Sequence, residues 1–298
     1  MELLIGTERT GDEATERTEY EATTVKSLLR GLLHQPQVTS LWVGMLRHVD
    51  ELLSACHCES DVRDLEQDQD FQLTKDTANS IQGWMADVEG ALLYSLAKKC
   101  NPNGVIVEIG SWKGKSTIFL ARGSKAGQGA PVYAIDSHEG NAEVLVDTPT
   151  FDEFKKNIAN AQLADIVVPI VKTSQEAAND FLEPCGLIFV DGCHEPDSVK
   201  QDFELWCPKL IEGGVIAFHD TFGWAGPRML VKDSLYKSSN FKNVRFARSI
   251  TYGEKVVQNT LADRMKNRYF LLFNDIVALC FSCFEKIGRF GSRVGDRH

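Results

Sequence analysis

Two segments in the middle of the chain place carboxylates beside imidazoles. The segment LIFVDGCH carries Asp191 and, three residues later, His194, and the segment GGVIAFHD ends with His219 and Asp220. The two carboxylates suit a hard cation such as Mg²⁺, and the imidazole of His219 extends the set to Mn²⁺ or Fe²⁺. A bound cation would lower the pKa of a substrate hydroxyl, whose proton His194 could then remove. The alternative is structural, with carboxylates that cap loops and a hydrogen-bonded core histidine.

A glycine-containing turn lies upstream of these groups. The segment VIVEIGSWKGKS puts Gly110 and Gly114 directly after an apolar run and before a helix. Such glycines let backbone N–H groups approach a ligand, and the helix N-terminus adds the positive end of its dipole. The spacing lacks the middle glycine of the dinucleotide motif G-x-G-x-x-G, which disfavours a nicotinamide cofactor. The alternative is an ordinary turn that ends a strand of any α/β protein.

Two further carboxylates belong to the same candidate site. Asp136 ends the run VYAID, where a carboxylate can accept both ribose hydroxyls of a cofactor. Glu108 precedes the turn and can bind an ammonium group directly or through water. Together with the turn, they predict a site for a nucleoside cofactor.

The elements that must position these groups alternate between strands and helices. Short β-branched or aromatic runs predict strands, which are 105–109, 132–136, 166–171, 187–191 and 215–218, with a hairpin of 244–250 and 252–257. Helix character lies between them, at 116–124, 151–161, 175–182 and 198–210. This alternation predicts a doubly wound, Rossmann-like α/β sheet covered by helices on both faces. Because ligands bind outside the carboxyl ends of such strands, the turn and both acidic segments should share one cavity.

The remaining sequence predicts a helical extension at each end. We expect an N-terminal helical extension or lid over 1–75, a central α/β domain over 76–257 and a C-terminal helical segment over 258–298. Within the first, apolar residues between 25 and 53 recur at helical spacing. The stretch 59–76 is acidic and weakly apolar, so we expect it to be a linker or lid.

The C-terminal segment contains the run YFLLFNDIVALCFSCF at 269–284. It is apolar almost all round, but it is too short, and too interrupted by Asn274 and Asp275, to span a bilayer. We expect this helix to pack against the sheet or a second subunit, in a homo-oligomer. Four basic residues follow it and leave peripheral membrane contact as a less favoured interpretation: Lys286, Arg289, Arg293 and Arg297.

Composition restricts the class of partner. Hydrophobic residues make up 43% of the 298 residues and charged residues 25%, which is typical of a soluble globular protein. The formal net charge of −10 argues against nucleic acid as a partner, because phosphate contacts need clustered lysine and arginine. The opening MELLIGTERTGDEATERTE holds no apolar run of signal-peptide length, so we expect a cytoplasmic protein.

At these motifs the sequence resembles the class I S-adenosylmethionine-dependent methyltransferases, roughly over 80–257. It is most similar to the group that joins small O-methyltransferases with macrolide sugar methyltransferases and cephalosporin hydroxylase-like proteins. EIGSWKGKS resembles the cofactor turn of catechol-type enzymes, VKTSQEA their segment beside the adenine, and FVDGCH the strand that supplies a metal-binding Asp and a base. The resemblance implies a metal at Asp191 and a base at His194. It implies cofactor contacts at Glu108, Gly110, Ser111, Trp112, Ser116, Ser174 and Gln175. With Gly114, Asp136 and Asp191, these are the cofactor-binding residues predicted for this chain.

In those relatives the fifth strand ends in two acidic residues, or in Asp and Asn, whereas here His219 and Asp220 take these places. The metal set predicted for this chain is therefore Asp191, His219 and Asp220. The resemblance also implies that the region of Trp84 and Met85 closes over the sulfonium.

The sequence thus predicts an S-adenosylmethionine-dependent methyltransferase. We expect O-methylation of a hydroxylated small molecule, natural product or sugar-like, assisted by a divalent metal and the base His194. Trp112, Phe222 and Trp224 are expected to form an apolar wall around the acceptor. Three alternatives stay open: an N-methyltransferase that needs no metal, a non-catalytic scaffold that binds a partner, and an iron-dependent hydroxylase suggested by His219 beside Asp220.

Overall fold

The computed structural model describes residues 65, 67–140 and 149–276. The helices expected between 25 and 53, and the part of the apolar run after 276, lie outside the described residues. The described residues fall within one compact unit, 56–298, which holds the candidate site.

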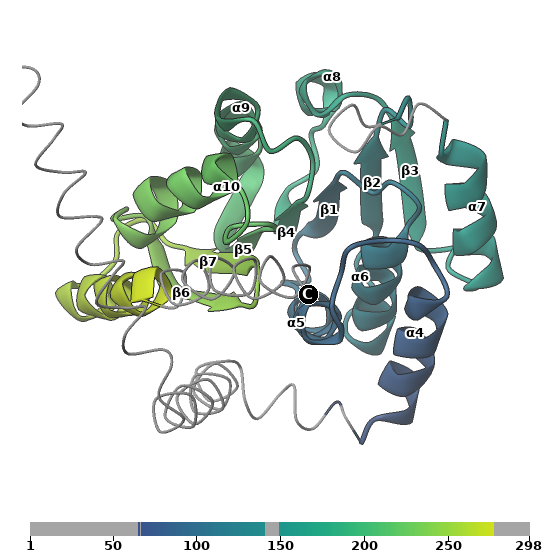
Figure 1. The fold of residues 1–298 in the computed structure, drawn as a ribbon, viewed down its shortest axis with the longest axis horizontal. Coiled ribbons are helices and arrows are strands. Elements are labelled where there is room, and N and C mark those ends of the chain that lie inside the picture. The colour runs from purple at the N-terminus through teal and green to yellow at the C-terminus, as the bar shows by residue number, and fades with distance from the viewer. Residues whose placement is uncertain (1–64, 66, 141–148, 277–298) are drawn as a thin grey trace, which may run out of the picture. The chain divides into compact units, whose positions relative to one another are not determined.

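A seven-stranded sheet forms the centre of this unit (Figure 1). Its strands are β1 (Val105–Ile109), β2 (Val132–Asp136), β3 (Val167–Val171), β4 (Cys185–Val190), β5 (Leu210–Phe218), β6 (Phe241–Ala247) and β7 (Ile250–Lys255). The spatial order is β3-β2-β1-β4-β5-β7-β6. Strands β1 to β5 run parallel, whereas β7 is antiparallel to both β5 and β6. The predicted doubly wound α/β class and the closing hairpin are confirmed.

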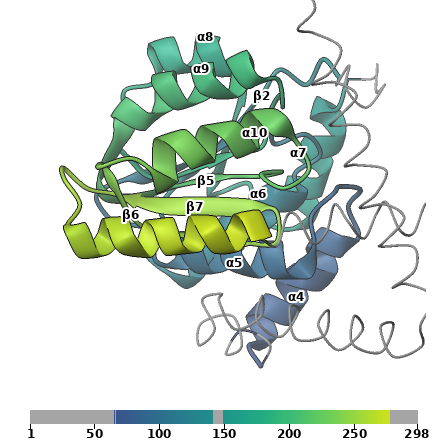
Figure 2. The ribbon, with the colours of Figure 1, turned by 60° about the vertical axis from the view of Figure 1, so that its left-hand side comes forward.

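Helices cover both faces of the sheet (Figures 1 and 2). They are α4 (Gln69–Asn79), α5 (Asp87–Lys98), α6 (Lys115–Ala126), α7 (Phe151–Asn160), α8 (Ser174–Asp180), α9 (Pro196–Trp206), α10 (Ala225–Leu230) with a π-helical continuation (Val231–Tyr236), and a last helix over 261–276. One buried cluster joins α4 to α7 to the first face, and a second joins α8 to α10 and the last helix to the other. The chain reverses its winding direction between β1 and β4, which is where ligands bind in such sheets.

The interpretation of 59–76 as a linker or lid rather than core is wrong from residue 69 onward, where α4 begins and contributes Phe71 to the core. Asp68 caps this helix, because its side chain accepts hydrogen bonds from the backbone N–H groups of Asp70 (2.9 Å) and Phe71 (3.3 Å). The ring of Phe71 is buried and packs edge-on against Tyr94 of α5, with 5.3 Å between centroids. One cap and one buried aromatic thus order a stretch whose average composition is polar.

Close packing of α5 against α6 holds α5 beside the sheet. A Cβ atom added at Gly123 of α6 would lie 2.2 Å from the carbonyl oxygen of Tyr94, and one added at Gly90 of α5 would lie 2.4 Å from the ring of Phe119. Side chains at these two positions would force the helices apart. Because α5 also carries Glu89, this contact fixes a carboxylate near the carboxyl ends of the strands.

The last helix, 261–276, lies on the β6–β7 hairpin (Figure 2). The side-chain amide of Asn267 donates to the carbonyl of Phe241 (2.9 Å) and accepts from the backbone N–H of Val244 (3.2 Å). The guanidinium of Arg245 lies 3.8 Å from the ring centre of Phe270. The predicted packing of this segment against the sheet is therefore confirmed for the described residues. Within them, no helix has the length and apolar character needed to cross a membrane.

Candidate functional site

A cavity of about 820 Å³ opens at the carboxyl ends of the parallel strands. Its walls come from the turn after β1, the ends of β2 to β5, and the loop between α4 and α5. Most of the residues predicted from the sequence line it: Gly110, Ser111, Trp112, Ser116, Asp136, Ser174, Gln175, Asp191, His194, His219 and Asp220. Glu108 and Gly114 are not among its lining residues. The structure thus brings the glycine turn and both acidic segments to one cavity.

The turn after β1 needs glycine for two reasons. Gly110 has a φ of +88°, and a Cβ there would lie 2.1 Å from the carbonyl oxygen of Asp191. Its N–H donates to the carbonyl of Ile135 on β2 (2.8 Å), so it lies wedged between β2 and β4. Gly114 has a φ of +90° and stands at the N-cap of α6, where its N–H donates to Ser111 (2.8 Å). Any side chain at Gly110 would separate the turn from the acidic cluster.

The carboxylate of Asp136 faces this turn. Its Oδ2 accepts the backbone N–H of Trp112 (2.8 Å), and its Oδ1 accepts the backbone N–H of His138 (2.7 Å). A carboxylate has about four acceptor positions, so each oxygen keeps about one for a ligand. Asp136 therefore fixes the turn and still presents two acceptors to the cavity.

Glu108 lies beneath the turn rather than in the cavity. Its side chain is fully buried, and Thr117 of α6 donates a 2.5 Å hydrogen bond to its Oε2. Burial raises the pKa of Glu108 to about 8, although the hydroxyls of Ser116 and Thr117 work against this rise. In this position the carboxyl of Glu108 supports α6. Its predicted contact with an ammonium group of the ligand would need a bridging water or a shift of the turn.

The cavity also contains a carboxylate that sequence reasoning missed. Asp202 of α9 lines the cavity and is largely buried, which raises its pKa to about 6 despite a hydrogen bond from Ser174. The indole N–H of Trp206 donates to the hydroxyl oxygen of Ser174 (2.8 Å), which leaves the hydroxyl hydrogen for Asp202. The sequence did contain an indication of this carboxylate. Val199, Asp202 and Trp206 lie on the inner face of α9, and an acidic residue among apolar ones on such a face is unusual.

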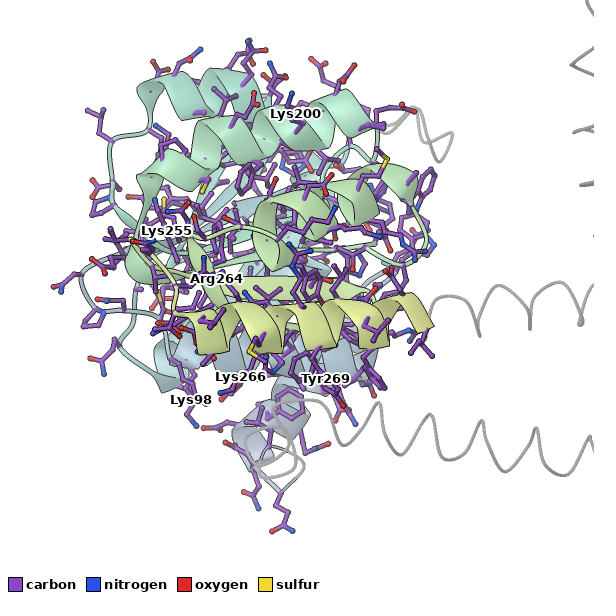
Figure 3. The ribbon with its side chains drawn as sticks, turned by 90° about the vertical axis from the view of Figure 1, so that its left-hand side faces the viewer. Lys98, Lys200, Lys255, Arg264, Lys266 and Tyr269 are labelled. Carbon is purple, nitrogen blue, oxygen red and sulfur yellow. The ribbon has the colours of Figure 1, made fainter. Side chains whose placement is uncertain are left out.

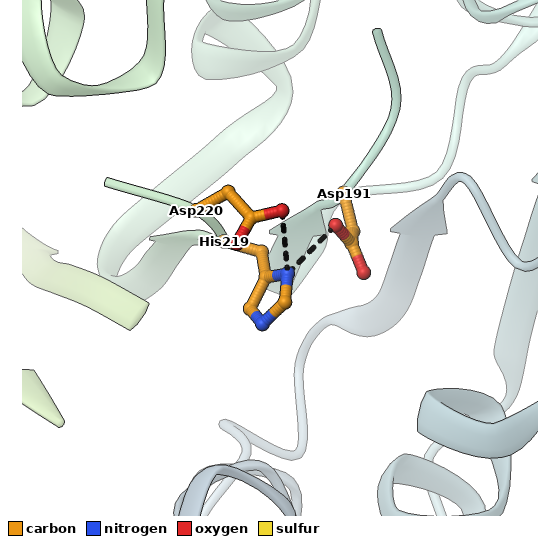
Figure 4. Close-up of side chains that lie close together, drawn as sticks. All are labelled: Asp191, His219 and Asp220. Atoms are coloured by element: carbon orange, nitrogen blue, oxygen red, sulfur yellow. Dashed lines mark hydrogen bonds and ion pairs between the residues drawn. The ribbon is translucent and has the colours of Figure 1, made fainter. Parts of the chain in front are cut away.

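In the same cavity, Asp191, His219 and Asp220 meet (Figure 4). Nδ1 of His219 lies 3.0 Å from Oδ1 of Asp191 and 3.5 Å from Oδ2 of Asp220. One ligand atom from each of the three residues falls within 4.8 Å of the others. Asp220 adopts a φ of +56°, a left-handed conformation that an aspartate tolerates better than most residues.

A third carboxylate, Glu89 of α5, closes this cluster and was not predicted. Its Oε1 lies 3.6 Å from Nε2 of His219 and accepts the backbone N–H of Ser249 (3.0 Å), while its Oε2 accepts the N–H of Ala86 (2.8 Å). Both ring nitrogens of His219 therefore face carboxylates. No motif pointed to this residue, because Glu89 precedes the motif strands and reaches them only through the packing of α5.

Burial by itself would lower the pKa of His219, but the charge of Asp191 and hydrogen bonds with Asp191, Asp220 and Glu89 outweigh it and raise this pKa well above its usual range. Hydrogen bonds and charge interactions with His194 and His219 hold the pKa of Asp220 well below its usual range despite burial. The cluster can thus stabilise one positive charge, either a proton on His219 or a cation. Two carboxylates and one imidazole at this spacing fit a divalent metal ion.

His194 and three tryptophans stand around the cavity. Nε2 of His194 lies 3.1 Å from Oδ2 of Asp220, and its ring stacks on Trp224 with 4.5 Å between centroids. Trp112 stacks on Trp84, with 5.1 Å between centroids. Trp112 and Trp224 therefore lie where the apolar wall was expected. Phe222 is not among the lining residues and packs against Phe246 (5.4 Å), so its predicted place in the wall is wrong.

A family model described as a methyltransferase domain matches residues 107–221. These residues are thus similar to a methyltransferase domain. The match runs from within β1 to just past β5 and contains the turn, Asp136 and the acidic cluster, apart from Glu89. The prediction of a methyltransferase is confirmed at this level.

The curated protein y4gI of Sinorhizobium fredii (strain NBRC 101917 / NGR234), itself uncharacterised, is 32% identical over 119 residues. The aligned part is 39% of this chain and 13% of that protein, so the chain spans a small part of that relative's length. Two solved structures share a broader but weaker likeness. The O-methyltransferase TomG from Streptomyces achromogenes, in complex with SAM, is 17% identical (TM-score 0.46; 63% of this chain, 90% of that chain). The O-methyltransferase from Bacillus cereus, in complex with SAH, is 20% identical (TM-score 0.43; 70% and 97%).

The buried carboxyl of Glu108 makes the stability of the folded unit depend on pH. Because burial raises the pKa of Glu108 to about 8 from an unfolded value near 4.5, the stabilising contribution of its neutral form is complete below pH 4.5 and is lost as pH rises through 8. Glu108→Gln keeps a neutral side chain at every pH. We expect it to exceed the wild type in unfolding free energy by on the order of 1–3 kcal/mol at pH 9, with the difference shrinking towards pH 4.5.

Urea unfolding, followed by circular dichroism at several pH values, measures the difference in unfolding free energy between the two proteins. Glu183→Gln, at an exposed position, is the control and should leave the pH dependence unchanged. If the unfolding free energies of the wild type and of Glu108→Gln change with pH in parallel, Glu108 is ionised in the folded chain, which would contradict the prediction.

Proposed function

We propose that this chain transfers the methyl group of S-adenosylmethionine to a hydroxyl group of a small molecule, natural product or sugar-like. The observation that carries the proposal is Asp136, whose carboxylate holds the turn after β1 and keeps acceptor positions towards the cavity. The methyltransferase domain match supports the methyl-transfer class. The net charge of −10 supports a small acceptor rather than nucleic acid.

The cavity offers groups for each part of the cofactor. Asp136 would accept the two ribose hydroxyls, and the backbone of the turn would meet the amino-acid end. Ser174, Gln175 and Asp202, which line the cavity, would meet the adenine, and the carboxylate of Asp202 could accept its amino hydrogens. The central unit 76–257 would then be the catalytic part, flanked by the extensions 1–75 and 258–298.

The acceptor would bind between the cofactor and the acidic cluster. His194 would remove the hydroxyl proton while the acceptor oxygen bonds to the methyl carbon and the carbon–sulfur bond breaks, which leaves S-adenosylhomocysteine. Asp220, 3.1 Å from Nε2 of His194, would orient the imidazole and stabilise its protonated form. A divalent cation held by Asp191, His219 and Asp220, with Mg²⁺ the first choice and Mn²⁺ or Fe²⁺ the others, would lower the pKa of the acceptor hydroxyl. The tryptophans would supply an apolar surface for the acceptor.

One observation favours a second candidate, methylation of an amine without a metal. The imidazole of His219 already lies between Asp191, Asp220 and Glu89, so a proton on His219 can balance these carboxylates without any ion. An amine acceptor needs no hydroxyl activation. The response to metal removal separates the two candidates.

Replacement of Asp136 tests the cofactor site. We expect Asp136→Ala to weaken S-adenosylmethionine binding by roughly 1.5–3 kcal/mol, because hydrogen bonds to a charged group are lost. Isothermal titration calorimetry measures the affinity. Asp165→Ala, which removes an exposed partner of Lys125, is the control and should bind as the wild type does. Equal affinity of Asp136→Ala and the control would contradict the assignment.

Removal of divalent ions tests the metal. We expect a chelator to lower methyl transfer to a hydroxyl by more than roughly 100-fold, because the cation supplies several kcal/mol of charge stabilisation, and Mg²⁺ or Mn²⁺ to restore it. Transfer of labelled methyl groups measures the rate, and calorimetry checks that cofactor binding survives. Full activity in metal-free protein would contradict the metal and favour the amine acceptor.

His194→Asn tests the base. We expect the turnover number to fall by roughly 10²–10⁴-fold, because the proton acceptor is lost, while cofactor affinity and melting temperature stay near those of the wild type. The turnover number of the wild type should fall at low pH, where His194 is protonated, and this fall should be absent from the pH–rate profile of the variant. An unchanged turnover number would exclude His194 as the base.

A further inference from the structure

The last helix, 261–276, carries a row of large apolar side chains on the side facing away from the sheet. We call Leu261, Met265, Tyr269, Leu272 and Ile276 the outer stripe. Each is 51–67% exposed within the described residues. Successive members are four, four, three and four residues apart, so they lie along one narrow face of the helix. None of them belongs to the candidate site.

The rotation of this helix is fixed by its inner face. Asn267 binds the backbone of Phe241 and Val244, Leu271 is buried in the core, and Arg245 stacks on Phe270. The outer stripe therefore cannot turn inward without breaking these contacts. Figures 2 and 3 show the helix on the outside of the β6–β7 hairpin, with no described element over its outer face.

An exposed row of this size calls for a partner. Five large apolar side chains in one contiguous row exceed what solvent-exposed helices usually carry, and burying each one fully contributes roughly 1.5–3 kcal/mol. Spacing by three and four residues is the pattern with which one helix packs against another. In the sequence, the same spacing continues to Leu279 and Cys283. The stripe therefore fits a helix.

The charges beside the stripe indicate which helix. Arg268 and Asp275 lie on the same edge of the stripe, seven residues apart and opposite in sign. When two copies of this helix pack antiparallel about a two-fold axis, Arg268 of one copy faces Asp275 of the other, twice. A parallel pair would lack this match. Asp275 already binds Arg228 (3.1 Å) and Lys232 (3.3 Å) but is partly exposed, and Arg268 forms no ion pair with any described residue.

We propose that the outer stripe is the interface of a homodimer, in which the helices 261–276 of two copies pack antiparallel across a two-fold axis. The stripe supplies the apolar seam, and Arg268 with Asp275 supplies the orientation. This interface lies away from the cavity and does not depend on the proposed methyl transfer.

Sedimentation equilibrium of the full chain without cofactor tests the proposal. We expect a dimer for the wild type, and Leu272→Glu to weaken dimerisation by roughly 30-fold or more, because a charge then lies in the centre of the seam. Leu182→Glu is the matched control, since Leu182 is 91% exposed and lies between α8 and β4. It should dimerise as the wild type does. Because both leucines are exposed, neither change should lower the melting temperature of the monomer.

Replacement of Arg268 tests the orientation. Arg268→Asp should weaken the dimer, whereas Arg268→Lys, which keeps a positive charge opposite Asp275 of the other copy, should dimerise as the wild type does. A monomeric wild type overturns the proposal. If that monomer floats with anionic vesicles, the stripe binds a lipid surface. If it stays in solution, the stripe packs against another segment of this chain. A dimer that persists in Leu272→Glu also overturns the proposal.

Discussion

The candidate site depends on one carboxylate that holds a turn. Asp136 accepts the backbone N–H groups of Trp112 and His138, and this ties the end of β2 to the turn after β1. Gly110 then fits between the strands with no room for a side chain against Asp191. The position of the turn is thus coupled to that of the acidic cluster, because a change at any of these residues moves both. A cofactor and an acceptor brought to this cavity would meet at a distance set by the sheet.

The acidic cluster depends on elements far from it in the sequence. Glu89 comes from α5, which reaches the sheet because glycines allow it to pack closely against α6. Ser249, in the turn between β6 and β7, holds Glu89 from the other side. His219 therefore lies among carboxylates from three parts of the chain. Such a concentration of like charge is costly unless a positive charge balances it, which is the physical reason to look for chemistry there.

Much of the fold was predictable because buried parallel strands are short, β-branched and followed by polar residues. Placing Asp136, Asp191 and Asp220 directly after such runs was enough to bring them to one edge of the sheet. Periodicity cannot give the direction of a loop side chain. Phe222 was therefore placed in the cavity wall, whereas its ring packs against Phe246.

Contacts between distant elements set a second limit on prediction. Asp202 and Glu89 lie on helices, where an acidic residue is normally a solvated one, and only the packing of α9 and α5 turns them inward. Glu108 was assigned to the ligand because it precedes the turn, but alternation along β1 directs its side chain towards Thr117 of α6. The start of α4 was missed since a single cap and one aromatic outweigh its polar composition.

A crystal structure of the full chain grown with S-adenosylmethionine tests the central claim most directly. The account predicts both ribose hydroxyls on the carboxylate of Asp136, the adenine beside Ser174 and Asp202, and the sulfonium methyl pointing towards His194. A nucleoside bound elsewhere, or an Asp136 carboxylate turned away from an otherwise intact turn, would contradict it.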